Sequence, residues 1–228
     1  MRTQHARSSR DDTRRRILEA AGRIFAGQGF DAATIKQITD AAQANVAAVN
    51  YHFGSKRKLY LEVLRLALPD IRERPFQAIP GSSPKEELRV FISSVFSSFL
   101  GEDHPRWHSE VAFKEVMSPS DALPKLVDEY FAPFTRDLEN LVRKFCAHEP
   151  EAEQVRLVAQ SIMALCVYWV IFQSFLPYVW PGFSVSEART KWIADFVYEL
   201  SLQALAMLEK VGPTKNLSAL KLPRLVAT

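Results

Sequence analysis

Glycine and cysteine are scarce in this sequence, with 8 glycines and 2 cysteines among 228 residues. Strands joined by tight turns need glycine, and no stretch alternates polar and apolar residues as a half-buried strand does. Cys146 and Cys166 belong to no metal-binding or redox motif. We therefore expect an all-α fold in which both cysteines are buried free thiols, with redox sensing by one of them as the alternative.

The common sequence signatures of catalysis are also absent. There is no glycine-rich phosphate loop and no G-x-S-x-G nucleophile elbow. His104 and His108 have the spacing of two metal ligands on one helix face, but Pro105 places His104 at the helix cap and no further ligand is evident. We expect no enzymatic activity, no cofactor and no metal site.

No uninterrupted apolar run is long enough to cross a membrane. The longest run, residues 162–172, has 11 residues, whereas a membrane-spanning helix needs about 20. A helix that is apolar on every side is buried on every side. One face of this helix should therefore meet its own core, and the other should meet a second subunit.

The most informative segment is residues 34–53, whose pattern predicts two short helices joined by a tight turn. Thr34 and Gln37 have the spacing of a capping box, and Asn45 is a favourable N-cap. In the second helix we expect an apolar stripe of Val46, Val49 and Phe53, and an outer face of Ala47, Ala48, Asn50, Tyr51 and His52. Such a face fits a DNA major groove, and an ordinary helical hairpin with a solvated outer face is the alternative.

The flanking segments favour the DNA-binding interpretation. Residues 13–27 form an amphipathic helix that Gly29 and Phe30 end. Ser55 caps a fourth helix whose first turn carries Lys56, Arg57 and Lys58. The helix dipole disfavours cations there, so DNA phosphates are suitable partners, while extension of the side chains into water is the alternative.

Together these segments resemble the TetR family of bacterial transcriptional regulators. The resemblance covers residues 13 to about 65, through R-R-R-I-L-E-A-A-G-R-I-F-A-G-Q-G-F, the Thr34 cap and V-N-Y-H-F-G-S-K-R-K-L-Y. It implies a helix-turn-helix head and a homodimer in which the last two long helices of each subunit pair. Gln43, Ala48 and Asn50 replace a frequent glycine, threonine and tyrosine of the family, which leaves the operator sequence open.

The resemblance also implies a set of DNA contacts, with residues 46–52 as the recognition helix. The residues that it places near phosphates are Thr34, Lys36, Tyr51, His52 and Lys56, of which Lys36 reaches a phosphate or a base. The residues that it places toward bases are Asn45, Ala47, Ala48 and Asn50.

Charge is distributed unevenly along the chain. Residues 1–68 carry 12 Lys and Arg against 6 Asp and Glu, whereas the remainder carries 17 against 20. A basic module on a slightly acidic body is expected where only one part meets nucleic acid. Residues 1–12, rich in arginine and without apolar anchors, should form a disordered arm that either follows the DNA or only aids solubility.

The positions of prolines and caps predict the remaining organisation. We expect a DNA-binding domain over residues 13–68, a helical ligand-binding and dimerisation domain over 69–212 and a tail over 213–228. The predicted helices run from 56 to the Pro75 region, 84 to 100, 105 to 118, 123 to 147 with a kink at Pro133, 150 to 175, and 185 to 211 with a cap at Ser184.

The resemblance further implies a small-molecule effector that binds the helical body. The candidate lining is mostly aromatic and comprises Trp107, His108, Phe113, Met117, Tyr130, Phe134, Tyr168, Trp169 and Phe172. Such a lining suits a hydrophobic or amphipathic compound, although aromatic residues at helical spacing more often belong to plain core.

These observations predict a ligand-responsive transcriptional regulator, in the first place a repressor. It would bind a palindromic operator in double-stranded DNA as a cytoplasmic, nucleoid-associated homodimer, and an effector would release it. The alternative is a helical interaction protein whose basic head binds protein or acidic membrane without a specific operator. An activator or dual regulator is a third, minor interpretation.

Overall fold

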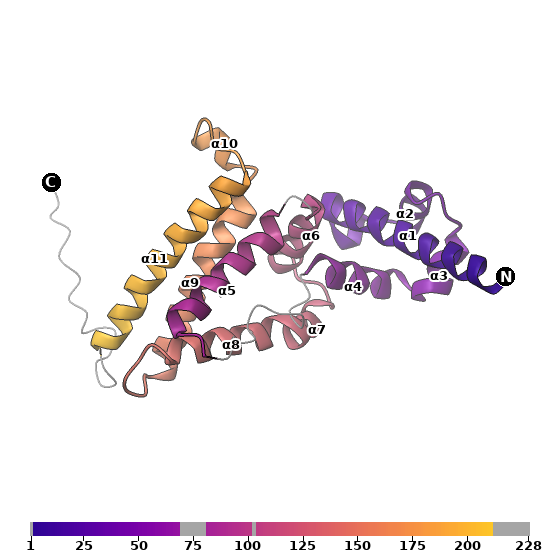
Figure 1. Cartoon of the computed structure of the whole chain (residues 1–228). Helices are drawn as coiled ribbons and strands as arrows, with labels where there is room; N and C mark the ends of the chain where they lie inside the picture. Colours follow the sequence, from indigo (N-terminus) through magenta and orange to yellow (C-terminus); the bar gives the residue numbers. More distant parts are fainter. Residues whose placement is uncertain (1, 69–80, 102–103, 212–228) are drawn as a thin grey trace.

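The computed structural model describes residues 2–68, 81–101 and 104–211, and helices with their connections account for all of these ranges (Figure 1). The predicted all-α fold is confirmed. The helices, in chain order, are α1 Arg2–Ala32, α2 Ile35–Ala41, α3 Val46–Phe53, α4 Lys56–Ala67, α5 Pro84–Leu100, α6 Arg106–Met117, α7 Leu123–Leu126, a π-helical turn Val127–Phe131, α8 Ala132–Arg143, α9 Ala152–Phe172, α10 Leu176–Val179 and α11 Glu187–Val211.

The helices form an elongated molecule with a head of α1–α4 and a body of α5–α11. Figure 1 shows the head at one end, α9 and α11 at the other, and α6 and α7 between them. Two apolar cores support this shape. The first core fills the head and also takes in Trp107, Val111, Leu126 and Tyr130 from α6, α7 and the π turn. The second core joins α5, α8, α9 and α11.

Four of the predicted helix caps are present where the sequence indicated them. Thr34 and Gln37 form a complete capping box, and so do Ser83 and Glu86 ahead of α5. The Asn45 side chain accepts from the Ala47 N–H at 2.9 Å, and the Ser55 hydroxyl accepts from the Lys58 N–H at 3.2 Å. Each cap satisfies a backbone donor that has no partner within its own helix, so these residues fix where α2 to α5 begin.

The cap of α11 is a correction to the sequence analysis. Ser184 was expected in this role, but the Ser186 hydroxyl accepts from the Arg189 N–H at 3.3 Å and α11 begins at Glu187. Both serines stand in the same short polar segment, and the cap is the one that directly precedes the first helical residue, Glu187.

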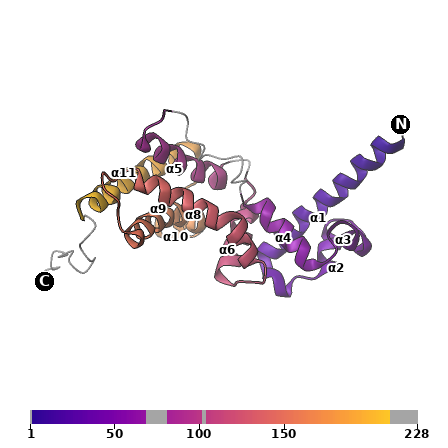
Figure 2. The same cartoon turned by 90° about the horizontal axis from the view of Figure 1, so that it is seen from below.

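Helix α1 begins earlier than predicted. It is helical from Arg2, whereas residues 1–12 were expected to be disordered. No glycine or proline occurs before Gly22, so each added residue extends the helix by one hydrogen bond. Figure 2 shows this N-terminal half of α1 projecting beyond α2 and α3. At its other end α1 bends at Gly29, whose φ of 84° is the left-handed conformation expected there.

Two other helices differ from their predicted extents. Helix α4 ends at Ala67, and Leu68 is extended because the following Pro69 disfavours helical geometry in the residue before it. The rest of the extent predicted for α4, through the Pro75 region, and the tail over 213–228 lie outside the described residues. The long helix expected over 123–147 is divided into α7, the π turn and α8, so the irregularity precedes Pro133.

Helix α9 has 21 residues and includes an 18-residue window with a mean hydropathy of 1.8, so by length and composition alone it could span a membrane. The prediction that no apolar segment is long enough to cross a membrane counted only the uninterrupted run of 11 residues, and the helix that contains this run is longer. In the fold, one face of α9 packs into the core of the body through Val155, Ile162 and Cys166. Burial raises the pKa of the Cys166 thiol to about 12, so this cysteine behaves as the apolar core residue that was expected.

The head and the body meet most closely where α6 crosses α1. A Cβ atom added to Gly22 would lie 2.2 Å from Cζ3 of Trp107. The indole therefore rests directly on the backbone of α1. Nearby, the Lys114 ammonium donates to the Gly27 carbonyl at 3.0 Å. These contacts tie α6 of the body to the first helix of the head.

We predict that Gly22→Ala destabilises the protein, because the added methyl group overlaps the Trp107 ring. Overpacking of this kind costs about 1–3 kcal/mol, which exceeds the gain of about 1 kcal/mol from replacing a helical glycine by alanine. Equilibrium urea unfolding measures the difference. The matched control is Gly27→Ala on the same helix, where nothing lies within 4 Å of the added Cβ and a gain in stability is expected. Equal stabilisation by both substitutions would contradict the close contact.

Candidate nucleic-acid interface

The turn between α2 and α3 holds a backbone conformation that glycine would adopt more easily. Gln43 has φ of 49°, the left-handed region. The turn is closed by two backbone hydrogen bonds, from Gln43 N to the Asp40 carbonyl at 3.2 Å and from Ala44 N to the Thr39 carbonyl at 2.9 Å. Glutamine stands here in place of a glycine that is frequent in the family that the sequence resembles. The structure shows that this turn does require positive φ.

Helix α3 presents a face of small and polar side chains. Val49 and Phe53 are buried in the head core, while Ala47, Asn50 and Tyr51 are exposed, Tyr51 at 70%. Two expectations about this helix were wrong. Val46 is 48% exposed instead of joining the apolar stripe, because it opens the helix one turn before Asn50 and shares that residue's face. Ala48 is half-buried and packs against the core.

Asn45 and Thr34, both predicted to contact DNA, also hold helix termini. The Asn45 side-chain oxygen accepts from the Ala47 N–H, which leaves its amide N–H groups for a base or phosphate. The Thr34 hydroxyl donates to Gln37 Oε1 at 2.9 Å and accepts from the Gln37 N–H. Both residues are exposed.

The residues predicted to contact phosphates differ in the interactions that they make within the protein. Lys36 pairs with Asp40 at 2.8 Å, but both side chains are well exposed, and such surface pairs contribute little. The Tyr51 ring lies edge-on to the half-buried His52, with centroids 5.0 Å apart. These three side chains surround the exposed face of α2 and α3, as a contact with a DNA backbone requires.

The three cations of the first turn of α4 have different environments. Lys56 donates to the Asp31 carbonyl at 3.2 Å and lies 4.6 Å from the Phe30 ring centroid. Arg57 pairs with Asp121, 3.3 Å away in the connection between α6 and α7. Lys58 is exposed at the same end of the helix. Lys56 was predicted to contact phosphate, but Lys58 is the more exposed of these two lysines, and only the structure separates them.

The nine residues predicted to line an effector pocket do not come together. Trp107 and Tyr130 are buried in the head core, whereas Phe134 and Trp169 pack against the core of the body. The others range from half-buried to exposed, namely His108, Phe113, Met117, Tyr168 and Phe172. The physical reason is that α6, the π turn and α9 turn their aromatic residues toward different neighbours. At helical spacing these residues serve as core and as surface.

The body does contain a cavity of about 810 Å³ between α5, the start of α6, the end of α9 and the start of α11. None of the nine predicted residues lines it. Its wall combines apolar with charged side chains, and the lining includes Arg89, Phe96, Phe99, His104, Arg106 and Lys191. This volume lies within the usual range of ligand sites, about 300–1,000 Å³. Neighbouring residues on one helix did not reveal the cavity because four separated segments enclose it.

The two histidines beside this cavity are held in their neutral form. Their rings meet edge-on with centroids 4.6 Å apart. Burial lowers the pKa of His104, and burial together with the nearby His104 lowers the pKa of His108 to about 4. Within the residues that the structure describes, no cluster of three or more His, Cys, Asp or Glu side chains could hold a metal ion.

The outer faces of α9 and α11 carry a broad apolar surface. Trp192 on α11 is 54% exposed, and its ring stacks on Phe196 with an interplanar angle of 8°. The other exposed apolar side chains of this surface are Leu157, Tyr168 and Phe172 on α9 and Leu200 and Met207 on α11. The opposite faces of the same two helices form the body core. Large exposed apolar patches on soluble proteins mark interaction sites.

Two protein-family sequence models match the chain. The model described as bacterial regulatory proteins, tetR family, matches residues 17–63. The model of the C-terminal domain of the HTH-type transcriptional dual regulator CecR matches residues 84–208, more than half of the chain.

Curated relatives and solved structures agree with these matches. The chain is 30% identical to the HTH-type transcriptional repressor NicS of Pseudomonas putida over 46% of this chain and 50% of that protein. It is 26% identical to the HTH-type transcriptional activator FasR of Mycolicibacterium smegmatis over 72% of this chain and 75% of that one. The match to the first of these relatives thus spans only half of its length.

The fold is similar to that of NalD, the secondary repressor of the MexAB-OprM multidrug efflux pump in Pseudomonas aeruginosa. The TM-score is 0.62 at 19% identity, over 86% of this chain and 96% of that one. A TetR-like transcriptional regulator from Rhodococcus sp. RHA1 also gives 0.62, at 17% identity over 85% and 96%. At these identities the likeness shows the fold alone.

We predict that Gln43→Gly stabilises the protein by about 1 kcal/mol, because glycine adopts positive φ without the steric cost that a Cβ atom brings. Thermal and urea unfolding measure the gain. Gln43→Ala is the matched control, since it shortens the side chain but keeps the Cβ atom, and it should leave stability within about 0.5 kcal/mol of the parent. If alanine stabilised as much as glycine, loss of the glutamine side chain would be the cause and not relief of the backbone.

Proposed function

Because the chain belongs to the TetR family and is a DNA-binding transcriptional regulator, we propose that it acts as a homodimeric repressor of a palindromic operator, and that a small-molecule effector releases it. The exposed face of α3 is the observation that carries this proposal. Ala47 and Asn50 are exposed on that face, and the buried Val49 and Phe53 fix the helix from behind.

In this proposal α3 enters the major groove and its surroundings contact the backbone. Asn50 reads a base edge, since a carboxamide can pair with adenine in two places. Val46 adds an apolar contact that suits a thymine methyl group, and Asn45 and Ala47 approach the bases beside it. Ala48 is half-buried, so it contributes to the packing of α3 more than to contact with a base. The phosphate contacts are Thr34, Lys36, Tyr51, His52 and Lys56, to which we add Lys58.

A homodimer follows from the apolar surface of α9 and α11. One recognition helix of eight residues gives little specificity, whereas two half-sites on one DNA add their binding energies. The stacked Trp192 and Phe196 would lie at the centre of the interface, where aromatic side chains contribute most. Pairing of these helices places the two heads side by side at the far ends of the bodies.

The cavity of the body is our proposed effector site in place of the predicted aromatic one. Phe96, Phe99 and Leu100 give it an apolar wall, and Arg106 and Lys191 give it a charged rim, so an amphipathic compound fits. His104 and Arg106 stand just before and at the start of α6, the helix that packs on α1 and α4. An effector releases DNA only if it binds better to one arrangement of the heads than to the other. The protein would act in the cytoplasm, at the nucleoid.

The test of operator binding is selection of genomic fragments by the purified full chain at about 150 mM salt, where non-specific phosphate binding is weak. We expect a few inverted-repeat sites. Asn50→Ala should change the preferred base at one position of each half-site, whereas Lys58→Gln should weaken all sequences alike and reduce the salt dependence by about one ion per half-site. Random fragments would favour a basic head that binds protein or acidic membrane, and equal loss on every sequence for both variants would contradict the assignment.

The dimer is tested by replacing the stacked pair on α11. Trp192→Glu with Phe196→Glu places two carboxylates in the proposed interface, so we expect a monomer at micromolar concentration in sedimentation velocity and the loss of operator binding. Val116→Glu, an equally exposed apolar residue of α6, should leave the dimer intact. A double variant that sediments as the parent would place the interface elsewhere.

A further inference from the structure

A row of charged side chains runs from the recognition helix to the body on the side of α4. The residues are Arg14 on α1, Glu62 and Arg65 on α4, and Glu129 in the π turn, and we call them the charge ladder. We propose that the charge ladder positions the recognition helix relative to the body, so that its four members determine where α3 meets DNA without touching DNA themselves. This inference rests on the DNA-binding function of the head.

The first rung joins three helices of the head through Arg14. Its Nη2 donates to Glu62 Oε2 at 2.7 Å, and its guanidinium carbon lies 5.4 Å from the centroid of Phe53. Phe53 is the last residue of α3 and is buried. A guanidinium over an aromatic face is attractive, so Arg14 holds the end of the recognition helix against both α1 and α4.

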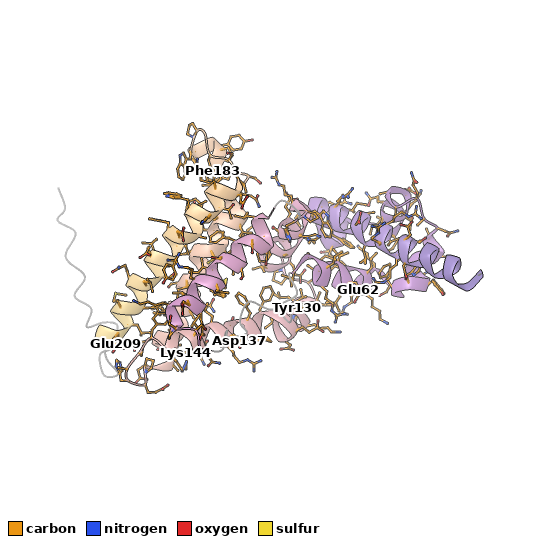
Figure 3. The ribbon with its side chains drawn as sticks, in the orientation of Figure 1. Glu62, Tyr130, Asp137, Lys144, Phe183 and Glu209 are labelled. Carbon is orange, nitrogen blue, oxygen red and sulfur yellow. The ribbon has the colours of Figure 1, made fainter. Side chains whose placement is uncertain are left out.

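The second rung is the Glu62 carboxylate, which is shared between two arginines. Its Oε2 accepts from Arg14, and its Oε1 accepts from Arg65 Nη1 at 2.7 Å. Figure 3 labels Glu62 on α4, and Tyr130, the neighbour of Glu129 in the chain, in the adjoining part of the body. One carboxylate bridging two cations fixes their relative positions, and movement of either arginine changes the hydrogen bonds of the other.

The third rung crosses from the head to the body. Arg65 Nε donates to Glu129 Oε2 at 2.9 Å and its Nη2 donates to Glu129 Oε1 at 2.7 Å. This paired geometry is the most directional of the ion pairs found in proteins. The side chains of Glu62, Arg65 and Glu129 are only 29–33% exposed, so salt screens them less than the surface pairs around them. The hydrogen bonds that Arg65 donates to Glu129 raise the pKa of the guanidinium above its ordinary value.

Glu129, at the body end of the charge ladder, lies in a segment whose backbone departs from the regular α-helix. It stands in the π turn that separates α7 from α8, and such turns inside helices are frequent at functional positions. Trp107 on Gly22, one of several other attachments of head to body, is close-packed and has no room to slide. The charge ladder differs from it because it reaches the end of α3 through Arg14, so it sets the angle of the recognition helix.

Amide hydrogen exchange of the full chain without DNA tests the proposal directly. Glu129→Gln and Arg14→Gln should each raise exchange in α3 by about threefold and leave α2 near the parent rate, although Glu129 lies outside the head. The matched controls are Asp128→Asn in the same turn and Arg15→Gln, which pairs with Asp12 on its own helix. An α3 rate unchanged in Glu129→Gln overturns the proposal. A uniform rise over α1–α4 also overturns it, because it shows only a general loss of head stability.

A double-mutant cycle on DNA adds a second readout. Operators with the selected half-sites at different separations are bound by the parent, by Arg14→Gln, by Glu129→Gln and by the double variant. If the charge ladder positions α3, each single substitution should weaken the preference for one half-site separation. The double variant should show no weaker preference than either single variant. The two effects on affinity should therefore depart from additivity by about fivefold, as expected for the two ends of one network. Additive effects contradict the charge ladder. If the parent itself shows no preferred separation, the palindromic operator of the proposed function fails while the exchange experiment still decides this inference.

Discussion

The packing of α6 on the head is the constraint on which the rest of the structure depends. Besides Trp107 on Gly22, it includes a buried carboxylate, Glu115, that is 2% exposed. Its oxygens accept from the Tyr60 hydroxyl at 2.8 Å and from the N–H and hydroxyl of Ser120 at 3.0 and 2.9 Å. A buried charge is tolerated only when its hydrogen bonds are complete. Burial, with Glu115 next, raises the pKa of Tyr60 well above its ordinary value, so the phenol stays a donor and α4, α6 and the α6–α7 connection remain fixed to one another.

This packing explains why the apolar core of the head continues into the body. Leu64 of α4 and Trp107 and Tyr130 from the body belong to one buried cluster, so the boundary predicted between residues 68 and 69 divides the chain but not the packing. A head that shares its core with α6 cannot swing freely on a linker. Its orientation is therefore a property of the whole subunit, as is required if events in the body are to change the distance between two recognition helices.

The parts of the molecule that could be predicted are those fixed by local chemistry. Capping residues such as Thr34 and Ser83, and the glycine bend at Gly29, follow from hydrogen bonds between residues three or four apart, which the sequence displays directly. Contacts between distant segments could not be predicted in this way. Nothing in the sequence shows that Lys56 contacts the Asp31 carbonyl, and periodicity cannot tell whether Tyr130 turns toward a ligand or toward the head. Within the charge ladder only Glu62 and Arg65 are close in the sequence, whereas the other two contacts join residues 48 and 64 positions apart.

Two kinds of contact between head and body imply two kinds of response to a change in the body. The contact of Trp107 with Gly22 is apolar and buried, so separating it exposes surface to water and leaves a cavity, each at a cost of several kcal/mol. The pairing of Arg65 with Glu129 is partly solvated, so water can replace some of the hydrogen bonds that are lost when the pair rearranges. A force applied at the start of α6 would therefore pass to α4 through these fixed contacts and be met by rearrangement at the π turn. The recognition helix would turn with α4 because Arg14 and Glu62 hold them together.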